Sequence, residues 1–316
     1  MEREVGLLSV VAPMYEEEEI VARFAERVAA ALDGLDYELI LVDDGSTDRT
    51  VEAMAEVAAA DPRVKVVALS RNFGHQPALT AGLDHARGDP VVMLDGDLQD
   101  PPEIIPQMLE QWRRGIDVVY AVRQERLGET VFKRTSARWF YRLFRRLTGL
   151  NLAVESGDFR LMDRRALDVL LAMPERNRFL RGMTVWIGFT QAAVPFVRQE
   201  RTTGVTKYPL RKMLRFSFDA ITSFSSAPLQ VATFMGFLFS GLAFLAIPLA
   251  VVARYTNIYE RGVPTTIVVV LFLGGVQLIT VGIIGEYVGR IYDEVKHRPL
   301  YVVRERINAE EPAERP

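Results

Sequence analysis

Short apolar segments alternate with amphipathic ones along the N-terminal two thirds of the chain. The apolar segments lack polar alternation, which is typical of strands buried on both faces of a sheet. They lie at 7–12, 37–42, 64–69 and 91–94. Between the first two, apolar residues recur at helical spacing, namely Ile20, Phe24, Val28 and Leu32. Strands that alternate with helices predict an α/β domain with a mostly parallel sheet.

Two longer apolar runs follow, at 229–253 and 263–285, and neither contains a charged residue. Each is long enough to cross the ~30 Å hydrocarbon core of a bilayer as a helix, whereas the alternative is a pair of buried core helices. The linker at 254–261 is short, so the runs predict a transmembrane hairpin. Lys and Arg are more frequent on both sides of the hairpin than in its linker, which places both termini in the cytoplasm.

These patterns divide the chain into four parts. We expect a catalytic domain at 1–206, a juxtamembrane amphipathic segment at 207–228, the two membrane helices within 229–288 and a cytoplasmic C-terminal segment at 289–316. From about residue 307 the sequence is charged and contains proline, which predicts disorder there.

The amino-acid composition limits the kinds of functional group that the chain can use. Hydrophobic residues make up 49% of the 316 residues, which is enough for a core. The formal net charge of -3 provides no general attraction to nucleic acid. Because the chain has no cysteine, disulfides, zinc-thiolate sites and thiol nucleophiles are excluded. Carboxylates, bases, hydroxyls and bound metals remain as the sources of chemistry.

Aspartates gather where two predicted strands end. Asp44 follows the second strand, and Asp95 and Asp97 follow the fourth. Ligands bind beyond the carboxyl ends of parallel strands, so these residues are expected on one rim. Carboxylates this close repel one another unless a cation lies between them, which predicts either a metal site or a solvated acidic turn. Asp100, which precedes two prolines, is expected to cap the next helix.

Five motifs, in their order and spacing, resemble those of glycosyltransferase family 2. They are APMYEEE at 12–18, VDDGSTD at 42–48, SRNFGH at 70–75, DGDLQDPPE at 95–103 and GDFRL at 157–161. More narrowly, the chain is similar to the polyprenyl-phosphate glycosyltransferases, the group of bactoprenol glucosyltransferases and dolichol-phosphate mannose synthases. The resemblance runs from about residue 7 to 304. It implies a GT-A type nucleotide-sugar-binding domain, a divalent metal and a lipid-phosphate acceptor.

The resemblance also implies roles for residues of the acidic motifs. Asp97 would be the direct ligand of Mg²⁺ or Mn²⁺, Asp95 would contact the metal or the ribose, and Gln99 would lie beside the diphosphate. Four residues match the nucleotide pocket of the family: Pro13, Tyr15, Glu17 and Asp44. His75 either helps to shape the donor site or is a packing residue at a helix start.

Asp158 matches the candidate catalytic base of the family. An inverting transfer needs the acceptor oxygen opposite the leaving diphosphate. A phosphate monoester has a second pKa of about 6 and is largely ionised at neutral pH. Asp158 is therefore expected either to deprotonate the acceptor or only to orient it, and a structural aspartate in a turn is the alternative. Arg160 is expected to brace Asp158.

Bringing two anions together requires cations around the acceptor. Charge and resemblance select four candidates: Arg123, Arg134, Arg201 and Lys207. Residues 131–146 also place arginines along one face of a predicted helix and aromatic residues on another. Such a helix either lies on an anionic membrane surface or is a packed helix with a solvated charged face.

The sequence thus predicts an inverting, metal-dependent transfer of a hexose to polyprenyl (undecaprenyl) phosphate at the cytoplasmic face of the cell membrane. UDP-glucose is the favoured donor, with GDP-mannose, UDP-GlcNAc and UDP-formamido-arabinose as alternatives. A processive polysaccharide synthase is a further alternative, but its Gln-x-x-Arg-Trp motif is absent, and the nearest stretch is RFLRGM at 178–183. The expected partners are the donor, the lipid acceptor and the bilayer, without nucleic acid, and a homotetramer is compatible with the resemblance.

Overall fold

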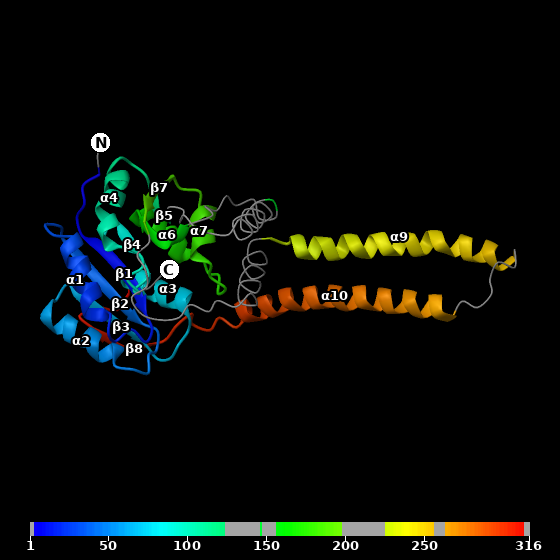
Figure 1. Ribbon diagram of the computed structural model, residues 1–316, viewed down its shortest axis with the longest axis horizontal. Helices are drawn as coiled ribbons and strands as arrows, with labels where there is room; N and C mark the ends of the chain where they lie inside the picture. The colour runs from blue at the N-terminus through cyan, green and yellow to red at the C-terminus, as the bar shows by residue number, and fades with distance from the viewer. Residues whose placement is uncertain (1–2, 124–145, 147–155, 198–224, 256–262, 313–316) are drawn as a thin grey trace. The chain divides into compact units, whose positions relative to one another are not determined.

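A computed structural model describes residues 3–123, 146, 156–197, 225–255 and 263–312 (Figure 1). The chain forms two compact units. The first combines Met1–Pro209 with Pro299–Pro316, and the second is Leu210–Arg298.

An eight-stranded sheet forms the centre of the first unit, in the order β7-β5-β6-β4-β1-β2-β3-β8. The strands are Leu8–Met14 (β1), Tyr37–Asp43 (β2), Val64–Leu69 (β3), Val91–Met93 (β4), Val118–Arg123 (β5), Ser156–Met162 (β6), Gln191–Phe196 (β7) and Val303–Ile307 (β8). Strands β4, β1, β2 and β3 are parallel neighbours, and β6 and β8 run antiparallel to the strands beside them. The predicted α/β class with a mostly parallel sheet is confirmed.

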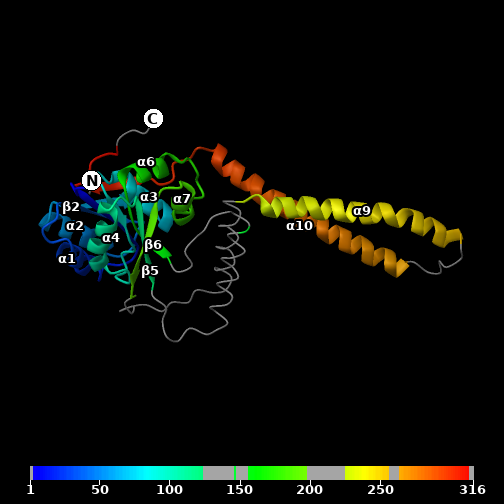
Figure 2. The same ribbon diagram turned by 90° about the horizontal axis from the view of Figure 1, so that it is seen from above.

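Helices cover both faces of this sheet (Figure 2). One face carries α1 (Val21–Ala31), α2 (Thr50–Ala60) and α4 (Ile105–Arg113), which follows the short 3₁₀ helix η1 (Pro102–Ile104). The other face carries α3 (His75–His85), α6 (Arg164–Ala172) and α7 (Leu180–Trp186). Every residue of β1 and β2 is buried, as the absence of polar alternation predicted.

A buried charge in the interior of the sheet is held by its neighbours. Glu38 in β2 is 2% exposed. Its carboxylate accepts hydrogen bonds from the Ser9 hydroxyl (2.5 Å) and the Arg87 backbone N–H (2.7 Å), and pairs with the Lys65 ammonium. Burial alone would raise the pKa of Glu38, but these donors hold it below its usual value. The buried charge of Glu38 therefore has hydrogen-bond and ion-pair partners, and these partners link β1, β2 and β3.

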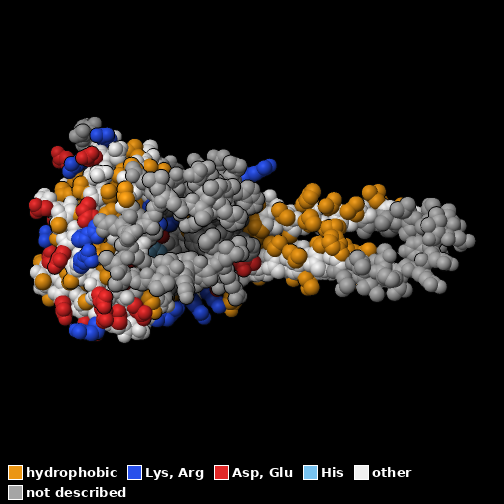
Figure 3. Space-filling model, in the orientation of Figure 1, with side chains coloured by type: hydrophobic (Ala, Val, Ile, Leu, Met, Phe, Trp, Pro, Cys, Tyr) orange, Lys and Arg blue, Asp and Glu red, His pale blue; other side chains and the backbone are white. Residues whose placement is uncertain are grey.

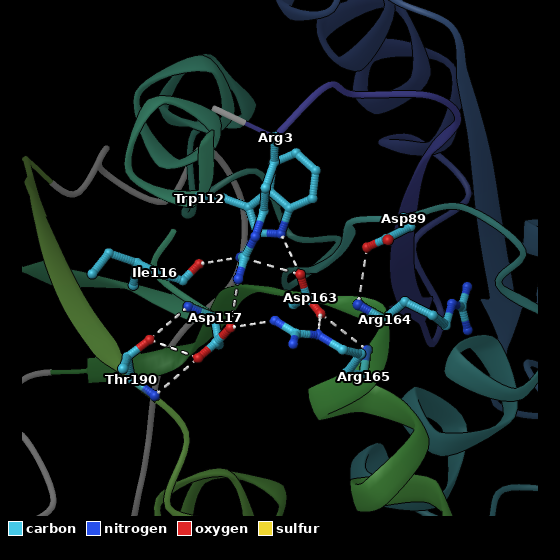
Figure 4. Close-up of polar contacts among 9 residues, drawn as sticks. All are labelled: Arg3, Asp89, Trp112, Ile116, Asp117, Asp163, Arg164, Arg165 and Thr190. Atoms are coloured by element: carbon cyan, nitrogen blue, oxygen red, sulfur yellow. Dashed lines mark hydrogen bonds and ion pairs between the residues drawn. The ribbon is translucent and has the colours of Figure 1, made fainter. Parts of the chain in front are cut away.

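A second polar cluster joins the N-terminal segment to the antiparallel strands (Figure 4). Asp117, just before β5, accepts hydrogen bonds from Arg3 (2.7 Å) and from the Thr190 hydroxyl (2.7 Å). Asp163, just after β6, accepts from the Trp112 indole (3.1 Å) and from the Arg165 guanidinium (3.0 Å). The cluster fixes the end of β6 against the start of β5. The opposite end of β6 carries Asp158.

The C-terminal segment differs from the expectation of disorder from residue 307. Ile307 is part of β8 and pairs with Val66 of β3, and the side-chain amide of Asn308 donates to the carbonyls of Ala58 (2.8 Å) and Val64 (3.0 Å). Charge and proline from residue 307 onward suggested an unfolded tail, yet the chain there is held by the edge strand β8, on which charged side chains are ordinary. The expected segment 289–316 is also divided, because Pro299–Pro316 belongs to the first unit.

Two long helices form the described part of the second unit, α9 (Ala227–Tyr255) and α10 (Val263–Val295). The helices pack on each other through Phe239 and Phe272, whose ring centroids lie 5.2 Å apart edge to face. Apolar side chains cover much of their described surface (Figure 3). Among the described residues, one stretch, Phe272–Val295, is long and apolar enough to cross a membrane, and Ala227–Leu242 is a shorter apolar helix. Both expected helices are therefore present, and within their described residues one stretch, in α10, is long and apolar enough to span a membrane.

Candidate active site

The acidic rim predicted from the sequence forms at the carboxyl ends of the parallel strands. Met14 at the end of β1 is in register with Asp43 at the end of β2, and the backbone N–H of Asp44 donates to the Met14 carbonyl (2.9 Å). Asp95 follows β4 on the other side of β1. Asp44 accepts a hydrogen bond from the Gly74 N–H (3.0 Å), and the next residue, His75, places its Nε2 3.4 Å from Asp95 Oδ1, so the two acidic loops meet at the start of α3.

The loop with Asp95 and Asp97 packs tightly against the end of β1. A Cβ on Gly96 would lie 2.8 Å from the Pro13 carbonyl oxygen and 2.9 Å from Met14 Cγ, so only glycine fits without a shift. The Gln99 backbone N–H then donates to Asp97 Oδ1 (3.1 Å). This packing places two carboxylates at the rim.

Asp100 is not the helix cap that the sequence suggested. Pro101 is the residue that precedes η1, and no side chain caps it, whereas Pro102 does occupy the first turn as expected. Asp100 is 1% exposed and lies 3.6 Å from the Arg123 guanidinium. The reason is that η1 starts one residue later than expected, which leaves Asp100 pointing to β5. Arg123, a candidate phosphate ligand, is thus positioned by a buried carboxylate.

Asp158 in β6 is held by groups from two helices on the same face of the sheet. His75 Nε2 lies 3.3 Å and Gln76 Nε2 lies 3.1 Å from Asp158 Oδ2, and the Arg181 guanidinium lies 3.5 Å from Oδ1. His75 Nε2 is also 3.4 Å from Asp95 Oδ1. One imidazole therefore connects the predicted catalytic aspartate with the predicted metal loop.

These contacts control protonation at the site. Burial alone would raise the pKa of Asp158, but His75, Arg181 and Arg160 together hold it well below its usual range. Burial would lower the pKa of His75, and the carboxylates of Asp158 and Asp95 raise it instead. Burial raises the pKa of Asp95. The low pKa favours the ionised form of Asp158 beside the guanidinium groups of Arg181 and Arg160.

Arg160 stabilises the neighbourhood of Asp158 without a direct ion pair to it. Its guanidinium donates to the Gly157 carbonyl (3.1 Å) and to the Thr184 hydroxyl of α7. Burial lowers the pKa of Arg160 to about 10, so the side chain stays protonated at neutral pH. Arg160 therefore braces the backbone beside Asp158, close to the expected role.

Asp44, one of the residues of the predicted nucleotide pocket, holds a neighbouring loop in place. The carboxylate of Asp44 accepts backbone hydrogen bonds from Phe73 (2.7 Å) and Gly74 (3.0 Å), which hold the loop before α3. Burial raises the pKa of Asp44. Tyr15 is 44% exposed beside it, and the Glu17 backbone N–H donates to the Thr50 hydroxyl (2.9 Å). Nucleotide contact by these residues stays a prediction.

Several expected cations cannot be placed. Arg134, Arg201 and Lys207 lie outside the described residues, as do nearly all of the basic helix at 131–146 and most of the juxtamembrane segment at 207–228. The structure thus describes Arg123 alone among the four candidates for phosphate binding.

The rim suits a divalent metal that is shared with a phosphorylated ligand. Among the described residues, no group of three or more His, Asp or Glu side chains could hold a metal without such a ligand. Asp95 Oδ1 is buried without a hydrogen bond, and Gln99 Nε2 is a buried donor without an acceptor. Mg²⁺ is commonly bound by one or two carboxylates together with phosphate oxygens. Asp95 and Asp97 fit that pattern.

Two residues of the site were not identified from the sequence, Gln76 and Arg181. Gln76 directly follows the SRNFGH motif, and Arg181 lies in the stretch considered only as a failed synthase motif. In the structure both lie in the first turn of a helix, Gln76 in α3 and Arg181 in α7. Their convergence on Asp158 depends on contacts between segments far apart in the sequence.

The mostly parallel sheet, with its acidic rim and the half-buried Asp158, is a GT-A-like α/β fold. Residues 9–171 match the model of the family described as "Glycosyl transferase family 2". The chain belongs to this family and is a glycosyltransferase.

Relatives that align with nearly the whole chain agree with this family assignment. The chain is 48% identical to "Uncharacterized glycosyltransferase YkcC" of Bacillus subtilis (strain 168), over 94% of this chain and 93% of the relative. It is 40% identical to "Bactoprenol glucosyl transferase" of Shigella phage SfV, over 94% and 98%. The solved glucosyl-3-phosphoglycerate synthase from Mycobacterium tuberculosis is 22% identical with a TM-score of 0.44, over 68% of this chain and 77% of that one. That likeness is too weak to assign a ligand to this chain.

Proposed function

We propose that the protein transfers glucose from UDP-glucose to a polyprenyl phosphate, with inversion at the anomeric carbon. A phosphate oxygen of the lipid would form the new bond to the anomeric carbon, and the bond from that carbon to the diphosphate of UDP would break. The observation that carries the proposal is the cluster that Asp158 forms with His75, Gln76 and Arg181 beside an acidic rim. Relatives 40% identical to the chain are named bactoprenol glucosyl transferases, which supports this acceptor and this sugar.

A divalent metal completes the donor site in this proposal. Asp95 and Asp97 would hold Mg²⁺ or Mn²⁺, which would neutralise the diphosphate and stabilise it as a leaving group. The buried amide of Gln99 is a suitable donor to a diphosphate oxygen, because its Nε2 has no acceptor within the described residues. The nucleoside would lie over the end of β1, beside Tyr15.

Asp158 orients the acceptor and is a poor proton acceptor. General base catalysis is most effective when the pKa of the base lies near the working pH. The cations around Asp158 hold its pKa well below its usual range, even though burial opposes this. A phosphate acceptor that is already ionised needs no base. Asp158 would therefore fix Arg181 and His75 where the acceptor phosphate meets the donor.

The proposed location is the cytoplasmic face of the cell membrane. The apolar stretch Phe272–Val295 supports a membrane crossing by α10. The charge-free run in α9 supports a second crossing, so two are proposed in total. With two crossings, both termini and the catalytic unit would lie on the side where sugar nucleotides are made. A homotetramer remains a proposal from the family resemblance.

A donor panel tests the proposal. The full chain in detergent would be incubated with undecaprenyl phosphate, Mg²⁺ or Mn²⁺, and UDP-glucose, GDP-mannose, UDP-GlcNAc or UDP-formamido-arabinose. Lipid-linked glucose that forms only with metal is the expected result. Transfer from another donor alone would replace the sugar assignment, and a growing polymer would favour the synthase alternative.

A further inference from the structure

Gln76, the second residue of α3, contacts the Asp158 carboxylate and the start of α7 at the same time. Its Nε2 donates to Asp158 Oδ2 (3.1 Å), and its Oε1 accepts from the backbone N–H of Leu180 (2.9 Å), which is the first residue of α7. The next residue of α7, Arg181, reaches the other carboxylate oxygen at 3.5 Å. A single amide thus joins the catalytic aspartate to the helix that carries its cation.

The two contacts admit one orientation of the amide. A side-chain amide has an oxygen that only accepts and a nitrogen that only donates. The reversed amide would place oxygen against the Asp158 carboxylate and nitrogen against the Leu180 N–H. Both contacts would then be unfavourable. The Gln76 side chain is therefore held in a defined orientation by its neighbours.

We infer that Gln76 is a positioning residue for the transfer, and this inference rests on the proposed function. Gln76 fixes the Asp158 carboxylate relative to α7, so that Asp158 and Arg181 meet the acceptor phosphate as a pair of fixed geometry. A neutral donor performs this without adding charge at the point where two anions meet. Gln76 acts through Asp158 and does not contact the substrates.

Gln191, the first residue of β7, offers a matched control that contacts the same helix, α7. Its Nε2 donates to the backbone carbonyl of Thr184 in α7 (2.7 Å), so it also joins α7 to a neighbouring element through one amide. In contrast to Gln76, it has no contact with Asp158 among its described hydrogen bonds. Changes at Gln191 therefore report the cost of loosening α7 alone.

The test compares Gln76→Glu with Gln191→Glu in the full chain, with UDP-glucose and undecaprenyl phosphate as substrates. Gln76→Glu keeps the acceptor for Leu180 but places a carboxylate oxygen against Asp158. We expect kcat to fall by about tenfold or more, which corresponds to the loss of one charge-assisted hydrogen bond. The KM for UDP-glucose should stay within about twofold, because the side-chain hydrogen bonds of Gln76 go to Asp158 and Leu180 and not to the residues predicted to bind the donor. Gln191→Glu should leave kcat within about twofold.

A double substitution separates positioning from structural support. In the Asp158→Asn background, Gln76→Glu should cause no further loss, because the amide introduced at 158 can donate to the carboxylate introduced at 76. If Gln76→Glu unfolds at a lower temperature than the wild type, Gln76→Met serves as the test instead. This variant removes both contacts of Gln76 without adding charge, so a folded Gln76→Met with reduced kcat indicates positioning.

Four results would overturn the inference. They are wild-type kcat in Gln76→Glu or in a folded Gln76→Met, an increase in KM alone, an equal loss in Gln191→Glu, and full additivity with Asp158→Asn. A wild-type chain without transfer from any donor would instead contradict the proposed function, and with it this role for Gln76.

Discussion

At the scale of single residues, Asp158 shows how neighbouring side chains decide what a carboxylate can do. Its burial favours the protonated acid, and His75, Arg181 and Arg160 outweigh that effect. The sequence predicted Asp158 because it lies in a recognisable motif. Gln76 and Arg181 belong to separate helices, and no periodicity or spacing connects them with β6. Their role could be found only from the folded chain.

The pH dependence of transfer distinguishes the two roles considered for Asp158. Because its pKa is held well below the usual range, Asp158 stays ionised at every pH from about 5 to 8. We therefore expect no loss of kcat from protonation of Asp158 in this range. The measurement is kcat against pH for the wild type and for Asp158→Asn. An acidic limb that Asp158→Asn abolishes would show that Asp158 acts as a base.

The buried Glu38 has a separate, pH-dependent effect on stability. Its folded pKa is depressed, so its stabilising contribution is present above the unfolded pKa of about 4.3 and is lost as the pH falls through the folded value. Glu38→Gln should lower the free energy of unfolding by about 2 kcal/mol at pH 7, because Lys65 and the Arg87 N–H lose a charged acceptor.

Denaturant unfolding of both chains, followed by tryptophan fluorescence, measures this difference. The difference should shrink as the pH is lowered through the folded pKa of Glu38. A difference that is constant with pH would mean that the Glu38 charge does not contribute.

At the scale of elements, strands and helices with a regular apolar pattern were predictable, and the edge strand was not. Strands β1 to β4 lie within a residue or two of the segments read from apolar runs. Strand β8 pairs with β3 from the far end of the chain, and its alternating charges resemble those of a solvated tail. Pairing across such a sequence separation leaves no local signal. The acidic rim was predictable because each part of it ends a parallel strand.

The close packing of the metal loop against β1 predicts the effect of Gly96→Ala. A Cβ there would meet the Pro13 carbonyl oxygen at 2.8 Å, so the loop with Asp95 and Asp97 must shift. We expect the apparent affinity for Mn²⁺ and UDP to fall by about tenfold or more, since a misplaced ligand weakens a metal site. Gly6→Ala is the control, because nothing lies within 4 Å of a Cβ at Gly6. Calorimetric titration measures both, and equal affinities would contradict the predicted packing constraint.

At the scale of the whole molecule, hydrophobicity alone predicted the two long helices. The charge-free runs became α9 and α10, and large apolar side chains such as Leu278, which is 75% exposed, lie on their surface. A soluble protein rarely exposes so much contiguous apolar surface. The sequence could not predict that the chain returns from α10 to complete the catalytic sheet.

Membrane insertion of α10 is tested by Leu278→Lys. A lysine near the centre of a membrane helix costs about 2.5 to 3.5 kcal/mol, so the fraction of protein that resists carbonate extraction should fall. Leu278→Ala removes the same side chain without a charge and should remain in the membrane fraction. If Leu278→Lys is extracted no more than Leu278→Ala, then this face of α10 does not contact lipid.

The most direct test of the whole account is the formation and anomeric configuration of the lipid-linked sugar. Purified full-length protein with UDP-glucose, undecaprenyl phosphate and Mn²⁺ should yield lipid-linked glucose in the β configuration, opposite to that of the α-linked donor, and Asp97→Asn should abolish most of it. No lipid-linked sugar from any donor, or a product that retains the α configuration, would contradict the account.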